Sequence, residues 1–335
     1  MPPKLKPEAS ICFEVTPALQ IFRSAVGNAN RCLNTLLVGL ETLKANEPVS
    51  PGDLVLTWHK PTDADEWRET RNFALRGTMV ALVDGLDRYL RVVASIDGLV
   101  DPSLIDILQG RRSASAERRP TIPQRVNALA ARYPGVARPE HCAAIQLLAA
   151  WRNKFVHRDY KFPLTLAERK QLAAAATFFA REHANADIMG ALERYDRNEA
   201  PTLADLSTLI ASTQRLARAF DEHFLQLQLG EPYALALLRH IVASDPDPAA
   251  RVEMLFKNGG NNASGRVHAC LLEHGGNNMQ NRRAGAPSLT RTALDGMFAI
   301  GRNQAAELFG IERKKTPPIP RVRRNRVVRG RRPAE

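Results

Sequence analysis

Residues 151–160, WRNKFVHRDY, combine side chains that could carry out phosphodiester chemistry. Arg152 offers a planar, permanently charged guanidinium that can bind two phosphate oxygens at once. His157 is of the residue type that titrates near neutral pH, so it could move the proton of a ribose 2′-hydroxyl or of the leaving 5′-oxygen. The trio of Arg152, Asn153 and His157 includes neither a carboxylate nor a cysteine, and it therefore suits metal-independent phosphodiester cleavage better than acyl transfer.

The same stretch also has a purely structural interpretation. It ends an alanine-rich, apolar segment that we predict to be a helix over residues 139–158, and basic side chains often lie in the last turn of a helix. At about 100° per residue, Asn153 and His157 share one face, whereas Arg152 and His157 lie roughly 140° apart. A single helix does not easily close both on one small ligand, which favours a site that two copies of the chain share.

The run AAWRNKFVHRDY resembles the R-x4-6-H signature of the HEPN superfamily, in which a polar residue, often Asn, follows the Arg. The predicted helical context, residues 66–185, is also similar to that of the family. The resemblance implies a HEPN-like antiparallel helical bundle and a metal-independent endoribonuclease without a cofactor, with a composite site across a homodimer. Arg152 and His157 would be catalytic, Asn153 would support them, and the products would carry 2′,3′-cyclic phosphate and 5′-hydroxyl ends.

Such proteins are typically toxins or effectors of antiviral and abortive-infection systems. The resemblance thus implies an RNA substrate and a cognate antitoxin or another defence-system partner. Two other function classes remain open: a non-catalytic HEPN-like adaptor that binds nucleic acid or protein, and a DNA-binding regulator. The DNA-binding regulator is suggested by NQAAELFGIERKK at residues 303–315, which has the beginning of a helix-turn-helix but is followed by Pro317 and Pro318.

The segment 312–335 is strongly basic. It contains ten Lys or Arg and two acids, so it carries +8 of the chain's net charge of +12. We predict a disordered, proline-interrupted tail that binds a phosphate backbone by counterion release, with a solubilising or partner-docking tail as an equal alternative. The side chains expected to contact nucleic acid, in the motif and in the tail, are Lys154, Arg158, Arg321, Arg323, Arg324 and Arg326.

The elements that position the motif are predicted to be helices. Apolar residues recur at helical spacing along most of the chain, and aromatic residues make up only 6% of it, which predicts an all-α fold. The predicted helices lie at about 17–45, 66–96, 123–133, 139–158, 164–185, 202–228 and 231–257, with a short one within 101–110. Because only a few residues around Pro163 separate two of them, we expect helices 139–158 and 164–185 to be antiparallel neighbours.

The composition of the sequence changes after Gly230, where glycine- and asparagine-rich runs appear, and this change indicates a second domain. We place a HEPN-like helical domain at 10–228, with its core at 66–185. A smaller helical domain of unknown role follows at 231–311 and ends in a helical pair at about 288–311. Residues 257–286 are predicted to be turns, because they contain the run GGNN twice, at Gly259–Asn262 and at Gly275–Asn278.

Two aspartates in the predicted helix 66–96 could suggest acid–base chemistry. Asp84 and Asp87 are three residues apart, and the same helix carries Arg88 and Arg91. Solvated ion pairs explain this pattern better than catalysis does. The sequence also lacks a P-loop, a dinucleotide fingerprint, an H-E-x-x-H motif and a nucleophile elbow. The motif at 151–160 is therefore the leading candidate site.

The remaining sequence features argue against other classes of protein. His268, Cys270 and His274 include metal-ligand types, but with three ligands in a glycine-rich setting we predict no metal site. The four cysteines are scattered, which fits free thiols in a reducing compartment. No stretch approaches the roughly 20 apolar residues that span a bilayer, so we expect a cytoplasmic protein without a membrane partner.

Overall fold

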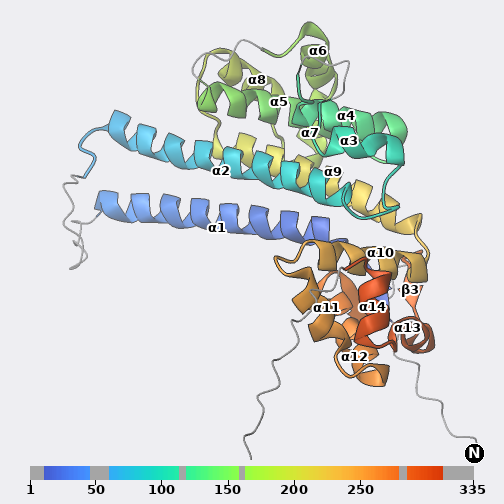
Figure 1. Ribbon diagram of the computed structural model, residues 1–335. Coiled ribbons are helices and arrows are strands. Elements are labelled where there is room, and N and C mark those ends of the chain that lie inside the picture. The colour runs from blue at the N-terminus through green and yellow to red at the C-terminus, as the bar shows by residue number, and fades with distance from the viewer. Residues whose placement is uncertain (1–10, 46–59, 113–117, 158–162, 279–284, 312–335) are drawn as a thin grey trace, which may run out of the picture.

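The computed structural model describes residues 11–45, 60–112, 118–157, 163–278 and 285–311. These residues form mainly α-helices, with one small three-stranded sheet (Figure 1). The predicted all-α fold class is therefore confirmed, with the sheet as an addition. In the described ranges, no helix is both long and apolar enough to cross a membrane.

Two long antiparallel helices, α1 (Pro17–Ala45) and α2 (Ala64–Val93), form the longest feature of the molecule (Figure 1). The helix predicted at 17–45 is confirmed, and the one predicted at 66–96 starts and ends slightly earlier. Helix α2 begins at Asp63 because the carboxylate of this residue accepts hydrogen bonds from the backbone N–H groups of Asp65 and Glu66. Its buried stripe contacts α1, α5 and α9, so α2 lies between α1 and the helices that carry the motif.

A layer of shorter helices covers the side of α2 away from α1 (Figure 1). In chain order these elements are the 3-10 helix η1 (Pro102–Leu104), α3 (Ile105–Leu108), α4 (Ile122–Arg132), α5 (Pro139–Val156), α6 (Leu166–Ala174), α7 (Ala176–Glu182) and α8 (Ile188–Asp196). The long helix α9 (Leu203–Gln226) then passes beneath them and contacts α1, α2 and α5. A buried hydrogen bond also links α9 to α2: the hydroxyl of Tyr89 on α2 donates to the carbonyl oxygen of Ala217 on α9 at 3.0 Å.

The predicted helix at 164–185 is wrong in one respect, because the chain forms two helices there. Ala175 separates α6 from α7, and its N–H group is shared between the carbonyl oxygens of Gln171 and Leu172, which tightens the turn. Helix α6 contacts α5, as expected for neighbours after a short connection. Helix α8, in the unassigned stretch before residue 202, also packs against α6 and α7.

The C-terminal elements form a second group of helices below one end of α1 and α9 (Figure 1). They are α10 (Gly230–Ala243), α11 (Pro248–Phe256), α12 (Gly260–Glu273), α13 (Arg291–Phe298) and α14 (Arg302–Leu308). The single helix predicted at 231–257 is wrong because Pro246 and Pro248 interrupt it, and Asp247 caps the new helix by accepting from the N–H group of Ala250. Before α13, the predicted helical pair at 288–311 begins with a short strand.

The prediction of turns throughout 257–286 is also wrong, because α12 occupies half of this segment. Asn258 and Gly259 have positive φ angles of 68° and 57°, so the first GGNN run supplies the left-handed turn that starts the helix. Val267 and Leu271 are buried one turn apart, which gives α12 its core face. The second run forms a short strand over its last three residues, Gly276–Asn278, and a Cβ atom on the preceding Gly275 would lie 2.0 Å from the carbonyl oxygen of Val15.

The three strands join distant parts of the chain. Strand β1 (Ile11–Phe13) lies between β2 (Gly276–Asn278) and β3 (Ser288–Leu289), and both pairings are antiparallel. Phe13 contacts Tyr233 of α10 edge to face, at a centroid distance of 5.0 Å. The range 10–228, predicted as one domain, thus contains a strand whose partners lie in the range 231–311.

A buried carboxylate holds the junction between β1 and α1. The N–H group of Thr16 donates to Oδ2 of Asp221 on α9 at 3.0 Å, and the Thr16 hydroxyl donates to Oδ1. Both side chains are fully buried. Burial raises the pKa of Asp221 to about 6, against the opposing effect of the hydrogen bonds from Thr16.

Candidate active site around Arg152

Helix α5 runs through the middle of the helical layer. Every residue from His141 to Trp151 is buried, so this part of the helix is surrounded by α2, α4, α6 and α9. The Trp151 indole donates to the carbonyl oxygen of Glu199 at 3.1 Å, which fixes the last buried turn against the segment after α8. The motif therefore begins where a rigid core helix reaches the surface.

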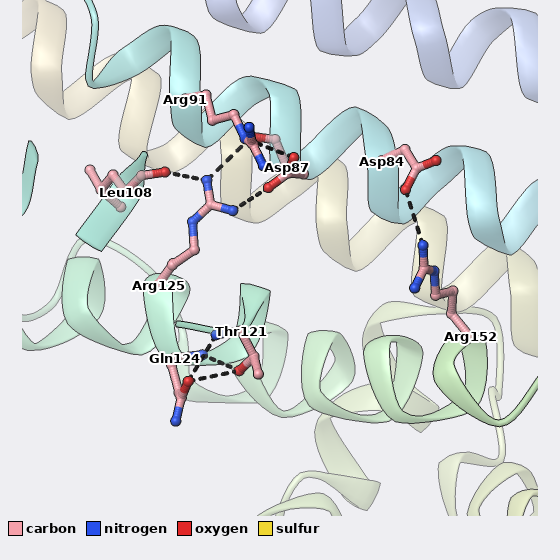
Figure 2. Close-up of polar contacts among 8 residues, drawn as sticks. All are labelled: Asp84, Asp87, Arg91, Leu108, Thr121, Gln124, Arg125 and Arg152. Atoms are coloured by element: carbon pink, nitrogen blue, oxygen red, sulfur yellow. Dashed lines mark hydrogen bonds and ion pairs between the residues drawn. The ribbon is translucent and has the colours of Figure 1, made fainter. Parts of the chain in front are cut away.

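Arg152 is the first residue of the motif, and its guanidinium is only loosely bound. The Nη2 atom lies 3.5 Å from Oδ1 of Asp84 on α2 (Figure 2). The Nη1 atom donates to Oδ1 of Asn153 at 3.2 Å. Arg152 is 23% exposed and Asp84 is 63% exposed, so water competes with this ion pair. The buried Nε atom has no hydrogen-bond partner among the described residues.

A second Arg–Asp pair lies three residues further along α2. Arg125 of α4 donates through Nη1 to Oδ1 of Asp87 and through Nη2 to the carbonyl oxygen of Leu108, at the end of α3 (Figure 2). Arg125 is 2% exposed, and Asp87 also pairs with Arg91 at 2.9 Å. Desolvation lowers the pKa of Arg125, but a guanidinium remains charged because its ordinary pKa is so high.

Between the two pairs, α2, α4 and α5 enclose a pocket of about 330 Å³. Its charged lining consists of Asp84, Asp87, Arg91, Arg119, Arg125 and Arg152, and Asn153 also lines it. The start of α4 forms another wall, where Thr121 and Gln124 make a reciprocal capping box (Figure 2). Two of the predicted site residues, Arg152 and Asn153, are therefore brought together in one polar pocket.

His157 has a different position from the one that the sequence pattern predicted. Helix α5 ends at Val156, and His157 has an extended backbone with φ −117° and ψ 110°. Val156 is 45% exposed, so a further helical turn would bury little apolar surface. The helix predicted over 139–158 thus ends two residues early, although the N–H group of His157 still donates to the carbonyl oxygen of Asn153 at 2.9 Å. His157 is exposed, and it is not among the described residues that line the pocket.

The Lys154 side chain contacts α8 rather than the pocket around Arg152. Its ammonium donates to the carbonyl oxygen of Tyr195 at 2.7 Å and lies 3.8 Å from the centre of the Tyr195 ring. Desolvation lowers its pKa. This side chain ties α5 to α8, and its predicted contact with nucleic acid would require breaking both interactions.

The other predicted nucleic-acid contacts cannot be placed. Arg158 and the tail residues lie outside the described residues; the latter are Arg321, Arg323, Arg324 and Arg326.

Sequence reasoning placed five charged residues of the pocket outside the site: Asp84, Asp87, Arg91, Arg119 and Arg125. Asp84 and Asp87 are indeed ion-paired, but their most important partners lie on α4 and α5 rather than on α2. Only the i, i+3 spacing of the two aspartates on one face of α2 hinted at shared neighbours. No local signal could identify those neighbours, because the pairing depends on how the helices pack.

His268 and Cys270 lie in α12, and His274 follows its last residue. The Cys270 sulfur accepts from Nη2 of Arg251 at 3.3 Å, and the His274 ring contacts the carbonyl oxygen of Cys270 at 2.8 Å. Over the ranges that the structure covers, no three His, Cys, Asp or Glu side chains form a group that could hold a metal ion.

No family model matches this chain, and neither the curated proteins nor the solved structures include one that matches it significantly.

Proposed function

We propose that this protein is a metal-independent endoribonuclease of the HEPN type, acting in the cytoplasm as a toxin-like effector of antiviral or abortive-infection defence. One observation carries the proposal: Arg152 of the motif lines a polar pocket, and its guanidinium is held there by a weak ion pair with Asp84 and a hydrogen bond to Asn153. A guanidinium in this state can exchange a carboxylate for a phosphate.

The proposed reaction is a transesterification within the RNA strand. The ribose 2′-oxygen attacks the adjacent phosphorus, the bond to the 5′-oxygen breaks, and the products carry 2′,3′-cyclic phosphate and 5′-hydroxyl ends. Arg152 would stabilise the negative charge that develops on the phosphate oxygens, and Asn153 would orient the guanidinium through its 3.2 Å hydrogen bond. His157 would move the proton of the 2′-hydroxyl or the proton that the leaving oxygen needs.

The position of His157 favours a site that two copies of the chain complete. Within one chain His157 is exposed and outside the pocket that contains Arg152. Apolar side chains near this end of α5 are also exposed: Val156 at 45%, and on α2 Phe73 at 77%. Phe73 precedes, by one helical turn, Arg76, whose guanidinium stacks on Phe155 of the motif at 4.8 Å. A second copy on this surface would cover these apolar groups and could bring its own His157 to the pocket.

RNA cleavage by the purified protein in excess chelator tests the proposal. We expect Arg152→Ala and His157→Ala each to lower the cleavage rate by about 10²–10⁴-fold. Arg68→Ala is the matched control, because Arg68 is an exposed arginine at the far end of α2. Unchanged cleavage in both motif variants would exclude the assignment.

Mixing the two inactive variants tests whether the site is shared. In a mixed dimer, one of the two composite sites would contain both Arg152 and His157, so activity should return to about a quarter of the wild-type value if subunits exchange freely. A site contained within one chain predicts no recovery.

The exposed position of His157 also favours one other function, a non-catalytic adaptor that binds nucleic acid or protein. The adaptor predicts salt-sensitive binding without turnover. It further predicts that deleting residues 312–335 weakens binding more than changing His157 does.

A further inference from the structure

The pocket beside Arg152 has more positive than negative charge. Its lining includes four arginines and two aspartates, which gives a formal charge of +2: Arg91, Arg119, Arg125 and Arg152 against Asp84 and Asp87. A phosphate diester carries one negative charge, and a monoester carries nearly two near neutral pH. The charge of the pocket therefore matches a phosphate group.

The four arginines differ in how available they are to a ligand. Arg125 is buried and already bound to Asp87 and to a backbone carbonyl. Arg91 shares the carboxylate of Asp87. Arg119 is exposed, and the only carboxylate that pairs with Arg152 among the described residues is Asp84, at 3.5 Å. Arg119 and Arg152 are therefore the two guanidiniums that can bind a ligand at the smallest cost.

The start of helix α4 adds to this positive potential. Thr121, Ile122 and Pro123, which begin the eleven-residue helix, all line the pocket. The helix dipole places a partial positive charge at this end. Helix α4 is also held rigidly, because its Arg125 is anchored to both α2 and α3.

We propose that this pocket is a phosphate-binding subsite, in which Arg119 and Arg152 bind a phosphate group and Arg125 positions the start of α4 beside Arg119. Without a ligand, Asp84 occupies Arg152, and a phosphate displaces it. The choice of an RNA strand as the source of the phosphate rests on the proposed function. Binding of the phosphate group itself rests only on the pocket.

Titration calorimetry on the full chain, at low salt and in excess chelator, tests the proposal. Three probes distinguish the sources of the phosphate: inorganic phosphate, a nucleoside 3′-monophosphate and a single-stranded 2′-O-methyl RNA. The methylated strand keeps its phosphates but cannot be cleaved through its 2′-oxygen. Any contribution of the basic tail is the same in every variant, so ratios between variants isolate the pocket.

The variants have opposite expected effects. Arg119→Ala and Arg152→Ala should each weaken binding about tenfold, because each removes charge-assisted hydrogen bonds. Asp84→Asn should strengthen binding several-fold, because it removes the carboxylate that competes for Arg152. Arg68→Ala, on the same helix but outside the pocket, should leave binding unchanged. Thermal melting checks that each variant is folded. If Arg152→Ala is unstable, Arg119→Ala alone tests the proposal, because Arg119 is exposed.

The outcomes separate this inference from the proposed function. Absence of binding by all three probes, or binding that Arg119→Ala does not change, overturns the subsite even if the protein cleaves RNA. Variant-sensitive binding in a protein that cleaves no RNA supports the subsite and removes the nuclease. Variant-sensitive binding of the small phosphates without that of the RNA strand overturns RNA as the source.

Discussion

Two Arg–Asp pairs lie side by side along α2 and behave as opposites. In both, an aspartate of α2 meets an arginine from the layer of shorter helices packed against α2, and the aspartates are only three residues apart (Figure 2). Arg125 is buried and has a backbone acceptor besides Asp87, whereas Arg152 meets an exposed Asp84 at 3.5 Å. Burial and the number of acceptors, rather than residue type, therefore distinguish a structural arginine from one that a ligand can recruit.

The largest expected effect comes from breaking the buried pair. Asp87→Ala should lower the free energy of unfolding by about 3–5 kcal/mol, because it leaves the Arg125 charge buried without its counter-ion. Urea denaturation followed by circular dichroism measures the loss. Asp106→Ala, which removes an exposed partner of Arg111, is the control. A loss below about 1 kcal/mol would contradict the structural role of Arg125.

Asp221, a buried carboxylate with no arginine ion pair among the described residues, shows what a guanidinium contributes. The folded pKa of Asp221 is about 6, above its usual value near 3.8. A raised carboxyl pKa means that the folded state binds the proton more tightly, so burying the charge costs about 3 kcal/mol at neutral pH. This cost should disappear as the pH falls through 6, and the gain in stability should be complete below about 4.

Measuring unfolding of wild type and Asp221→Asn across this pH range isolates the effect. The wild type should gain stability relative to the variant as the pH falls. Burial lowers the pKa of His141 to about 4, and its protonation destabilises the fold in acid, but both proteins share this opposing contribution. Parallel pH profiles would contradict the expectation.

An intermediate pair should give an intermediate effect. Arg194 of α8 donates to both carboxylate oxygens of Asp205 on α9, at 2.9 and 2.7 Å, and Asp205 is nearly fully buried. Arg194→Ala should cost about 2 kcal/mol, because Asp205 retains the hydrogen bond from the N–H group of Thr202. Arg197→Ala provides a comparison within the same segment, since its pairing with Glu199 is exposed. Equal losses in the free energy of unfolding for the two variants would show that burial does not determine how much an ion pair contributes to stability.

The smallest effect on stability is expected at the exposed pair. Asp84→Ala should change the free energy of unfolding by no more than about 0.5 kcal/mol, because both partners contact water. The measurement is the same urea titration that is used for Asp87→Ala. A loss of about 2 kcal/mol or more would place Arg152 in the same structural class as Arg125.

The helices of this protein were largely predictable from local pattern, and the site was predictable only in part. Periodic apolar residues located α1 and α9 closely, because their stripes face a continuous core. The glycine-rich start of α12 misled the prediction, since Asn258 and Gly259 serve as a turn and not as the end of regular structure. Local pattern specifies which face is buried, but tertiary contacts decide whether a turn-forming run begins a helix.

The motif itself shows where local reasoning ends. Its sequence correctly indicated that α5 leaves the core at Arg152, because polar residues follow a fully buried run. It could not indicate that α5 would end at Val156, since the position of the helix end depends on whether another part of the protein covers the Val156 side chain. It also could not identify Asp84 and Arg119 as neighbours of Arg152, because they come from segments that meet only in the fold.

The small sheet also limits the order in which the parts of the chain can fold. Strand β1 leaves the ribosome early, but β2 and β3, which pair with it, emerge only after all the helices from α1 to α12. During that interval Ile11 and Phe13, buried in the finished protein, lack their partners and are open to chaperones and proteases. A chain that stops before residue 276 lacks both pairing partners of β1, so the sheet can form only after α12 has been made.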